Sequence, residues 1–94
     1  MSNIMTERFI DIDSIEVLMT LFGNFDQNVN FIEDEIGVHI SARETQLRIS
    51  GEEANVKLAE SVIYKLLDLI RNKETLNMSR IGYAIQLVRS GHED

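Results

Sequence analysis

The stretch VHISARETQLRIS, residues 38–50, decides the fold. Apolar and polar residues alternate through residues 38–43 and again through residues 47–50, which is the period of a strand with one buried and one wet face. Residues 44–46 form the turn between the two strands. The residues expected to face the core are Val38, Ile40, Ala42, Leu47 and Ile49.

A long helix is predicted directly after the hairpin, over residues 52–73, because apolar residues recur there three and four positions apart. Gly51 is expected to break the strand before it. A last helix is predicted over residues 77–90, with Asn77 or Ser79 at its N-cap and Gly91 at its end. Its apolar stripe needs a partner, which is either the long helix, another domain or a second copy of the chain.

Before the hairpin, alternation in residues 7–13 predicts a short strand, with Phe9 and Asp11 on one side. The next helix begins at Asp13, which forms a capping box with Glu16, and ends at Gly23. The following helix begins at Asp26 or Asn28 and ends at Gly37. The whole order is β-α-α-β-β-α with one extra helix, which predicts an α+β fold with a three-stranded sheet and helices on one face.

Composition limits the possible functions. The chain has 94 residues, no proline and no cysteine, and 9 basic against 16 acidic residues give a net charge of −7. This length fits one domain, and a chain without cysteine has neither disulfides nor thiol chemistry. The negative charge repels phosphate backbones and anionic membranes, so nucleic-acid binding requires a local basic patch. No apolar run reaches a membrane span, so we expect a soluble cytoplasmic domain without a membrane partner.

The strand order, with a tight glycine-containing link between the first two helices, resembles a KH domain, in which a GXXG loop clamps single-stranded nucleic acid. The segments GNFDQNVNFIEDEIGVHISARETQLRISGEEANVKLAESVI and SRIGYAIQLVRSG are also similar to the region before the ATPase domain of PhoH-family proteins. Those proteins are cytoplasmic P-loop ATPases linked to phosphate starvation. The resemblance extends from about residue 10 to residue 91, and it rests on Gly23, Gly37, Gly51, residues 26–28 and residues 83–85.

The resemblance implies an accessory domain, with a KH-like part over residues 7–72 and an appended helix and tail over residues 73–94. The phosphate-binding signature G-x-x-x-x-G-K-[ST] does not occur in the sequence, so we expect no enzyme activity and no cofactor in this chain. ATP and Mg²⁺ are implied only for an ATPase domain of the same parent chain. Such a domain, single-stranded RNA and a second copy are the expected partners.

The candidate RNA site combines two regions. The link between the first two helices contributes Gly23, Asn24, Gln27 and Asn28, although the fourth loop position is the acid Asp26 and no cation lies in the loop. The alternative there is a plain helix C-cap at Gly23 and N-cap at Asp26, with Phe25 packed inward rather than stacked on a base.

The wet face of the hairpin contributes His39, Arg43 and Arg48, for which the alternative is an ordinary solvated strand face. A catalytic or metal role for His39 lacks a partner at suitable spacing. We therefore expect no catalytic and no metal site, and weak RNA binding. A protein-interaction or oligomerisation module of KH-like shape is the alternative function.

Overall fold

The predicted hairpin supplies the central strand and one edge strand of a three-stranded antiparallel sheet. In the computed structural model, which describes residues 5–91, β2 (His39–Arg43) and β3 (Gln46–Glu52) are paired with Ile40 opposite Ile49. The strand β1 (Met5–Asp11) pairs with the other side of β3, so the order in the sheet is β1-β3-β2. The longer of the two strand pairings, between β1 and β3, therefore joins the two strands that are farthest apart in the amino-acid sequence.

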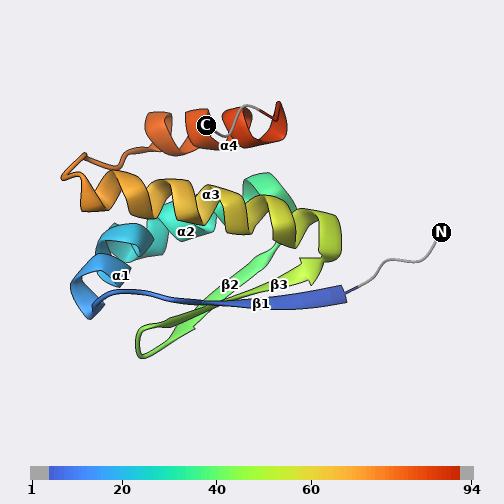
Figure 1. Cartoon of the computed structure of the whole chain (residues 1–94), viewed down its shortest axis with the longest axis horizontal. Helices are drawn as coiled ribbons and strands as arrows, with labels where there is room; N and C mark the ends of the chain where they lie inside the picture. Colours follow the sequence, from blue (N-terminus) through green and yellow to red (C-terminus); the bar gives the residue numbers. More distant parts are fainter. Residues whose placement is uncertain (1–4, 92–94) are drawn as a thin grey trace.

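Helices cover one face of this sheet and leave the other face open (Figure 1). Between β1 and β2 the chain forms α1, a short 3-10 turn η1, α2 and a π-helical turn η2, and after β3 it forms α3 and α4. Their bounds are α1 (Ile15–Phe22), η1 (Asn24–Asp26), α2 (Gln27–Ile32), η2 (Glu33–Gly37), α3 (Glu53–Arg71) and α4 (Met78–Arg89). The predicted α+β class and βααββα order with an extra helix are confirmed.

The core lies between the sheet and the helices. Ile10 and Ile12 from the first strand segment, Leu47 and Ile49 from β3, and a stripe along α3 are all buried. The buried residues are spaced two apart in the strands and three or four apart in the helices, as in the sequence pattern, because only one face of each element is removed from water. Within residues 5–91, no helix is both long and apolar enough to cross a bilayer.

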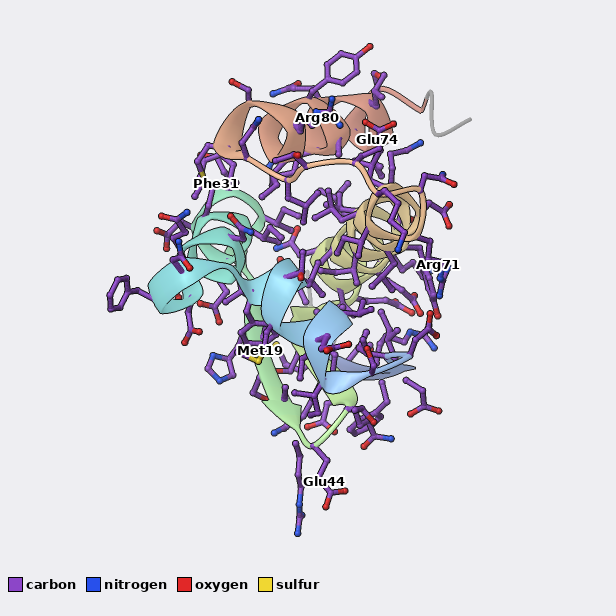
Figure 2. All side chains as sticks on the ribbon, turned by 90° about the vertical axis from the view of Figure 1, so that its left-hand side faces the viewer. Met19, Phe31, Glu44, Arg71, Glu74 and Arg80 are labelled. Atoms are coloured by element: carbon purple, nitrogen blue, oxygen red, sulfur yellow. The ribbon has the colours of Figure 1, made fainter. Side chains whose placement is uncertain are left out.

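The last helix, α4, forms a further layer on the side of α3 that faces away from the sheet (Figure 1). Its Ile81, Ala84 and Ile85 are buried in the common core. Gly82 lies close to Phe31 of α2, which points toward α4 in Figure 2, and the guanidinium of Arg89 donates to a main-chain carbonyl of η2 over 2.6 Å. The extra helix thus packs within the chain, and residues 92–94 of the expected tail lie outside the described residues.

Two predictions about where elements begin or end are wrong. The N-cap of α1 is Ser14, whose hydroxyl accepts from the amide of Val17 over 3.2 Å, and Asp13 instead pairs with Arg71. Gly51 does not break β3, since it pairs with Thr6 of β1. Aspartate often caps a helix and glycine often ends a strand, but here Asp13 pairs with Arg71 and Gly51 pairs with Thr6, both far away in the sequence.

Ala42 was expected in the core and is exposed. The hairpin reaches past the helices, so that its turn, marked by Glu44 in Figure 2, lies far from them. The last inward position of β2 therefore has nothing to pack against. Strand alternation indicates which side a residue faces, but not whether another layer covers it.

Candidate functional site

The link between α1 and α2 is a tight corner with an unusual backbone. Gly23 has φ 82° and ψ 177°, and its amide donates to the carbonyl of Met19 over 2.9 Å. Phe25 and Asp26 follow with φ 53° and 59°, which is the left-handed region that residues with side chains seldom adopt. Three departures from helical geometry within four residues turn the chain into α2.

The corner is held by Gly23 and Asn28. Asn28 is buried, and its side-chain amide donates to the carbonyl of Thr20 over 3.4 Å. A β-carbon on Gly23 would lie 2.6 Å from that amide nitrogen, closer than any real contact. The side chain of Asn28 therefore has a structural role, and glycine is required beside it.

A cavity of about 630 Å³ lies between this corner and the link that joins α3 to α4. Its apolar lining includes Leu18 and Phe22 of α1 and Leu76 of the link. Its polar lining includes Asn24, Asp26, Gln27, Glu74 and Thr75. Phe25 is not part of it, because its side chain is 99% exposed and projects into solvent. The expectation that Phe25 packs inward is wrong.

The second candidate region is the open face of the sheet. The strand register places Phe9, Arg48 and Ser41 in one row across β1, β3 and β2. The neighbouring row toward the turn contains Asp11, Gln46 and Arg43. A hollow of about 350 Å³ on this face is lined by residues of both rows and by Glu7.

Charges on the open face are partly paired. Arg48 forms an ion pair with Glu7, and the side-chain amide of Gln46 lies 3.5 Å from a carboxylate oxygen of Asp11. Arg43 has no ion pair with any residue in the described part of the chain. The hollow therefore combines one free cation, one paired cation and the half-exposed ring of Phe9.

His39 lies at the outer edge of β2 beside Glu33. One carboxylate oxygen of Glu33 accepts from the amide of Ile40 over 2.8 Å and lies 3.4 Å from Nδ1 of His39. That amide points away from β3, so Glu33 satisfies a main-chain donor that an edge strand otherwise exposes. No group of three potential metal-ligating side chains occurs within residues 5–91, and no site for a metal ion is apparent from the geometry of His39.

One side chain away from both regions has a shifted pKa. Arg71 at the end of α3 donates to Asp13 over 3.1 Å and to Asp68 over 3.3 Å. The hydrogen bond and the charge of Asp13, followed by those of Asp68, raise the pKa of Arg71 above its ordinary value. Arg71 therefore links the start of α1 to the end of α3 and remains charged at any physiological pH.

The seven predicted site residues fall into two separate places. Gly23, Asn24, Gln27 and Asn28 line the corner cavity, whereas Arg43 and Arg48 line the hollow on the open sheet face. His39 projects from the same strand as Arg43. No residue lines both hollows, so the structure does not bring the two predicted halves into one site.

Among the residues of these regions that were not predicted as site residues, Phe9, Phe25 and Glu33 illustrate different reasons for the omission. Phe9 was placed on the same side of its strand as Asp11, and an aromatic residue beside an acid on one strand face is the signal that could have singled it out. Phe25 was considered and given an inward position. Glu33 contacts β2 through the π-helical turn of η2, and nothing in the sequence indicates that turn.

Comparisons with known proteins gave partial sequence matches to PhoH-like proteins and structural matches to two crystal structures. No protein-family model matches the chain. A PhoH-like protein of Bacillus subtilis is 27% identical over 71 residues, which are 76% of this chain and 22% of that protein. A PhoH-like protein of Mycobacterium tuberculosis is 27% identical over 79 residues, which are 83% of this chain and 22% of that protein.

Two crystal structures from archaea share the fold at 16% sequence identity. Dim2p of Pyrococcus horikoshii superposes with a TM-score of 0.70 over 87% of this chain and 48% of that one. A protein of unknown function from Aeropyrum pernix superposes with a TM-score of 0.71 over 92% of this chain and 48% of that one. The chain is thus similar to a partial region, about a fifth, of PhoH-like proteins and is consistent with a domain of that family.

Proposed function

We propose that this chain is a non-catalytic accessory domain of a PhoH-like protein that binds single-stranded RNA weakly through the open face of its sheet. The match to a partial region of PhoH-like proteins supports the accessory role. The observation that carries the RNA-binding role is the hollow in which Phe9, Arg43 and Arg48 come together on an uncovered sheet. An aromatic ring can stack on a base, and arginines can bind the adjacent phosphates.

The corner residues are left out of this proposed RNA surface. Gly23, Asn24, Gln27 and Asn28 line a cavity that also contains Asp26 and Glu74 but no lysine or arginine. Like charges about 4 Å apart repel by about 1 kcal/mol even in bulk water. A phosphate is therefore disfavoured at the corner and favoured beside the free Arg43.

Affinity for RNA is expected to be low and sensitive to salt. Few cations face the hollow, and each phosphate neutralised on a single strand contributes about −0.7 to the slope of log affinity against log salt. Contacts from Arg43 and Arg48 then correspond to a slope of about −1.4. A dissociation constant on the order of tens to hundreds of micromolar is typical of such limited contacts at moderate salt.

A titration of a short labelled uridine-rich RNA, followed by fluorescence anisotropy, tests this proposal. We expect Arg43→Glu to weaken binding about tenfold or more, and Phe9→Ala to weaken it similarly, since stacking contributes about 1–3 kcal/mol per base. Lys57→Glu is the matched control, because it makes the same change in net charge on an exposed position of α3. Equal effects of Arg43→Glu and Lys57→Glu, or no binding at millimolar protein, would contradict RNA binding at this face.

The non-catalytic role is tested separately. The sequence lacks a P-loop, and ATP and Mg²⁺ are proposed to act in the remainder of a PhoH-like parent. Phosphate release from ATP by this chain is therefore expected to equal the buffer blank. Release above the blank that persists through repeated purification would show that the domain has a nucleotide site of its own.

A further inference from the structure

The corner cavity presents acceptors and negative charge to any ligand. Among its lining side chains, Asp26 and Glu74 are acids, Asn24 and Gln27 contribute amide oxygens, and no lysine or arginine is present. Glu74 already accepts from Arg80 over 2.7 Å, and the two side chains lie together at the start of α4 in Figure 2. Asp26 makes no side-chain cap for α2, so its carboxylate is open to another donor.

The inner lining of the same cavity is apolar. Leu18 is buried, and Phe22 and Leu76 are half-buried against the core, whereas Asn24, Asp26, Gln27 and Glu74 are exposed. A ligand that fits has an aliphatic stem to lie against these side chains and a cationic head to reach the acceptors. Arginine has this combination, and its planar guanidinium can donate to several acceptors at once.

Beside the cavity, Phe25 is exposed on an unfavourable backbone. Its ring is 99% exposed, and its φ of 53° lies in the region that bulky residues avoid. Its chain neighbours Asn24 and Asp26 both line the cavity, so Phe25 belongs to the same corner of the chain. Exposed aromatic side chains that partners bury are frequent anchors of protein interfaces.

We propose that this corner is a docking surface for a protein segment that contains an arginine, with the guanidinium in the cavity at Asp26 and neighbouring apolar residues of the segment on Phe25. This surface is additional to the proposed RNA face, and it shares no lining residue with it. The charge of the cavity selects a cationic partner and disfavours a phosphate. It also disfavours the same corner of a second copy, which has the same acids.

The test is a titration of the isotope-labelled chain with the peptide acetyl-Gly-Arg-Gly-amide, followed by backbone amide shifts in NMR. Peptides with Gln or Glu in place of Arg are the matched ligands. We expect the Arg peptide to shift the amides of residues 24–28 and 74–76 and the Glu peptide to leave them unchanged. Asp26→Asn should lower the affinity about threefold to fivefold, as expected for one solvent-accessible charge pair. Asp34→Asn makes the same change in net charge on the exposed surface of η2 and should have no effect.

A longer peptide tests the contribution of Phe25. This peptide has a leucine two residues before and two residues after the Arg, and it should bind more tightly than acetyl-Gly-Arg-Gly-amide. Phe25→Ser should remove the additional affinity of the longer peptide and leave the affinity for the short peptide unchanged. Three results would overturn the proposal. They are equal binding of the Gln and Arg peptides, equal effects of Asp26→Asn and Asp34→Asn, or shifts of the corner amides that arise from self-association or RNA instead. Loss of RNA binding by Arg43→Glu is independent of all three, so the two proposals can fail separately.

Discussion

At Gly23, the backbone angle and the surrounding space each exclude a side chain. The φ of 82° disfavours any residue with a β-carbon, and the amide of Asn28 occupies the position where that carbon would lie. Gly37 has nearly the same φ, 85°, but its nearest neighbour would be an ordinary 3.7 Å away. The two glycines share a positive φ, but only Gly23 combines it with a clash and with a ψ of 177°, a backbone region almost exclusive to glycine.

We expect Gly37→Ala to lower the free energy of unfolding by about 1–2 kcal/mol, the usual cost of a left-handed residue with a β-carbon. Gly23→Ala should cost more, because Asn28 must move and its buried amide then loses the carbonyl of Thr20, which adds about 1–3 kcal/mol. Urea unfolding followed by circular dichroism measures both values. Equal losses for the two variants would mean that the corner yields to the extra carbon without displacing Asn28.

Residue-level prediction from the sequence succeeded where a signal is local. Asn77 was one of two predicted caps of the last helix, and its side chain accepts from the amide of Arg80 over 2.9 Å. Asp13 had an equally plausible capping pattern, but Arg71, 58 positions away, holds its carboxylate. A local pattern cannot reveal a competitor from another element, and this is why Ser14 was missed.

Among the elements, α4 is the one whose place in the molecule the sequence left open. The alternatives were packing on the long helix, docking to another domain or contact with a second copy. The structure shows an apolar face of α4 buried against α2 and α3, with Ile85 only 1% exposed. Tyr83 on the same helix is 66% exposed.

We expect Ile85→Ala to lower the free energy of unfolding of the whole chain by about 2–5 kcal/mol, because it leaves a cavity in the common core. Tyr83→Ala is the control on the same helix and should cost less than about 1 kcal/mol. Chemical unfolding should remain one cooperative transition in both variants. If α4 were an independent appendage, Ile85→Ala would instead produce a separate early loss of helical signal and leave the main transition unchanged.

The elements themselves were mostly predictable from the sequence. Apolar residues alternate in the hairpin and recur at helical spacing after it, because each of these elements buries only one face. The sequence therefore predicted β2, β3 and α3. The segment from residue 24 to residue 37 was predicted as one link and one helix, but it contains a 3-10 turn, a short α-helix and a π-helical turn. These variations depend on contacts such as Glu33 with the edge of β2, which the sequence does not encode locally.

At the scale of the whole molecule, the two candidate surfaces differ in charge. The hollow on the open sheet face is lined by Arg43 and Arg48 beside Glu7, whereas the charged residues that line the cavity behind the α1–α2 corner, Asp26 and Glu74, are both acids. The sequence placed residues of both surfaces in one RNA site, because it does not show that the outward strand residues and the corner belong to different faces. The three-dimensional arrangement separates a face suited to anions from a cavity suited to cations.

This separation predicts how two acids should affect RNA binding on a chain of net charge −7. Glu7 pairs with Arg48 beside the hollow, whereas Glu35 is exposed on η2, where its main-chain carbonyl accepts from Arg89 of α4. Near physiological salt the Debye length is about 8 Å, so a distant charge is largely screened from the hollow. Glu7→Gln should then raise RNA affinity about twofold to fivefold, and Glu35→Gln should leave it nearly unchanged.

At low salt the two variants should converge, because the Debye length grows to about 30 Å at 0.01 M and both acids then contribute to the overall repulsion of RNA. Anisotropy titrations of both variants at low and at physiological salt measure the comparison. A difference that does not change with salt would indicate that Glu7 acts by blocking Arg48 sterically rather than through its charge. Equal affinities at physiological salt would move the RNA contact away from the open face, because only a surface remote from Glu7 is insensitive to its charge.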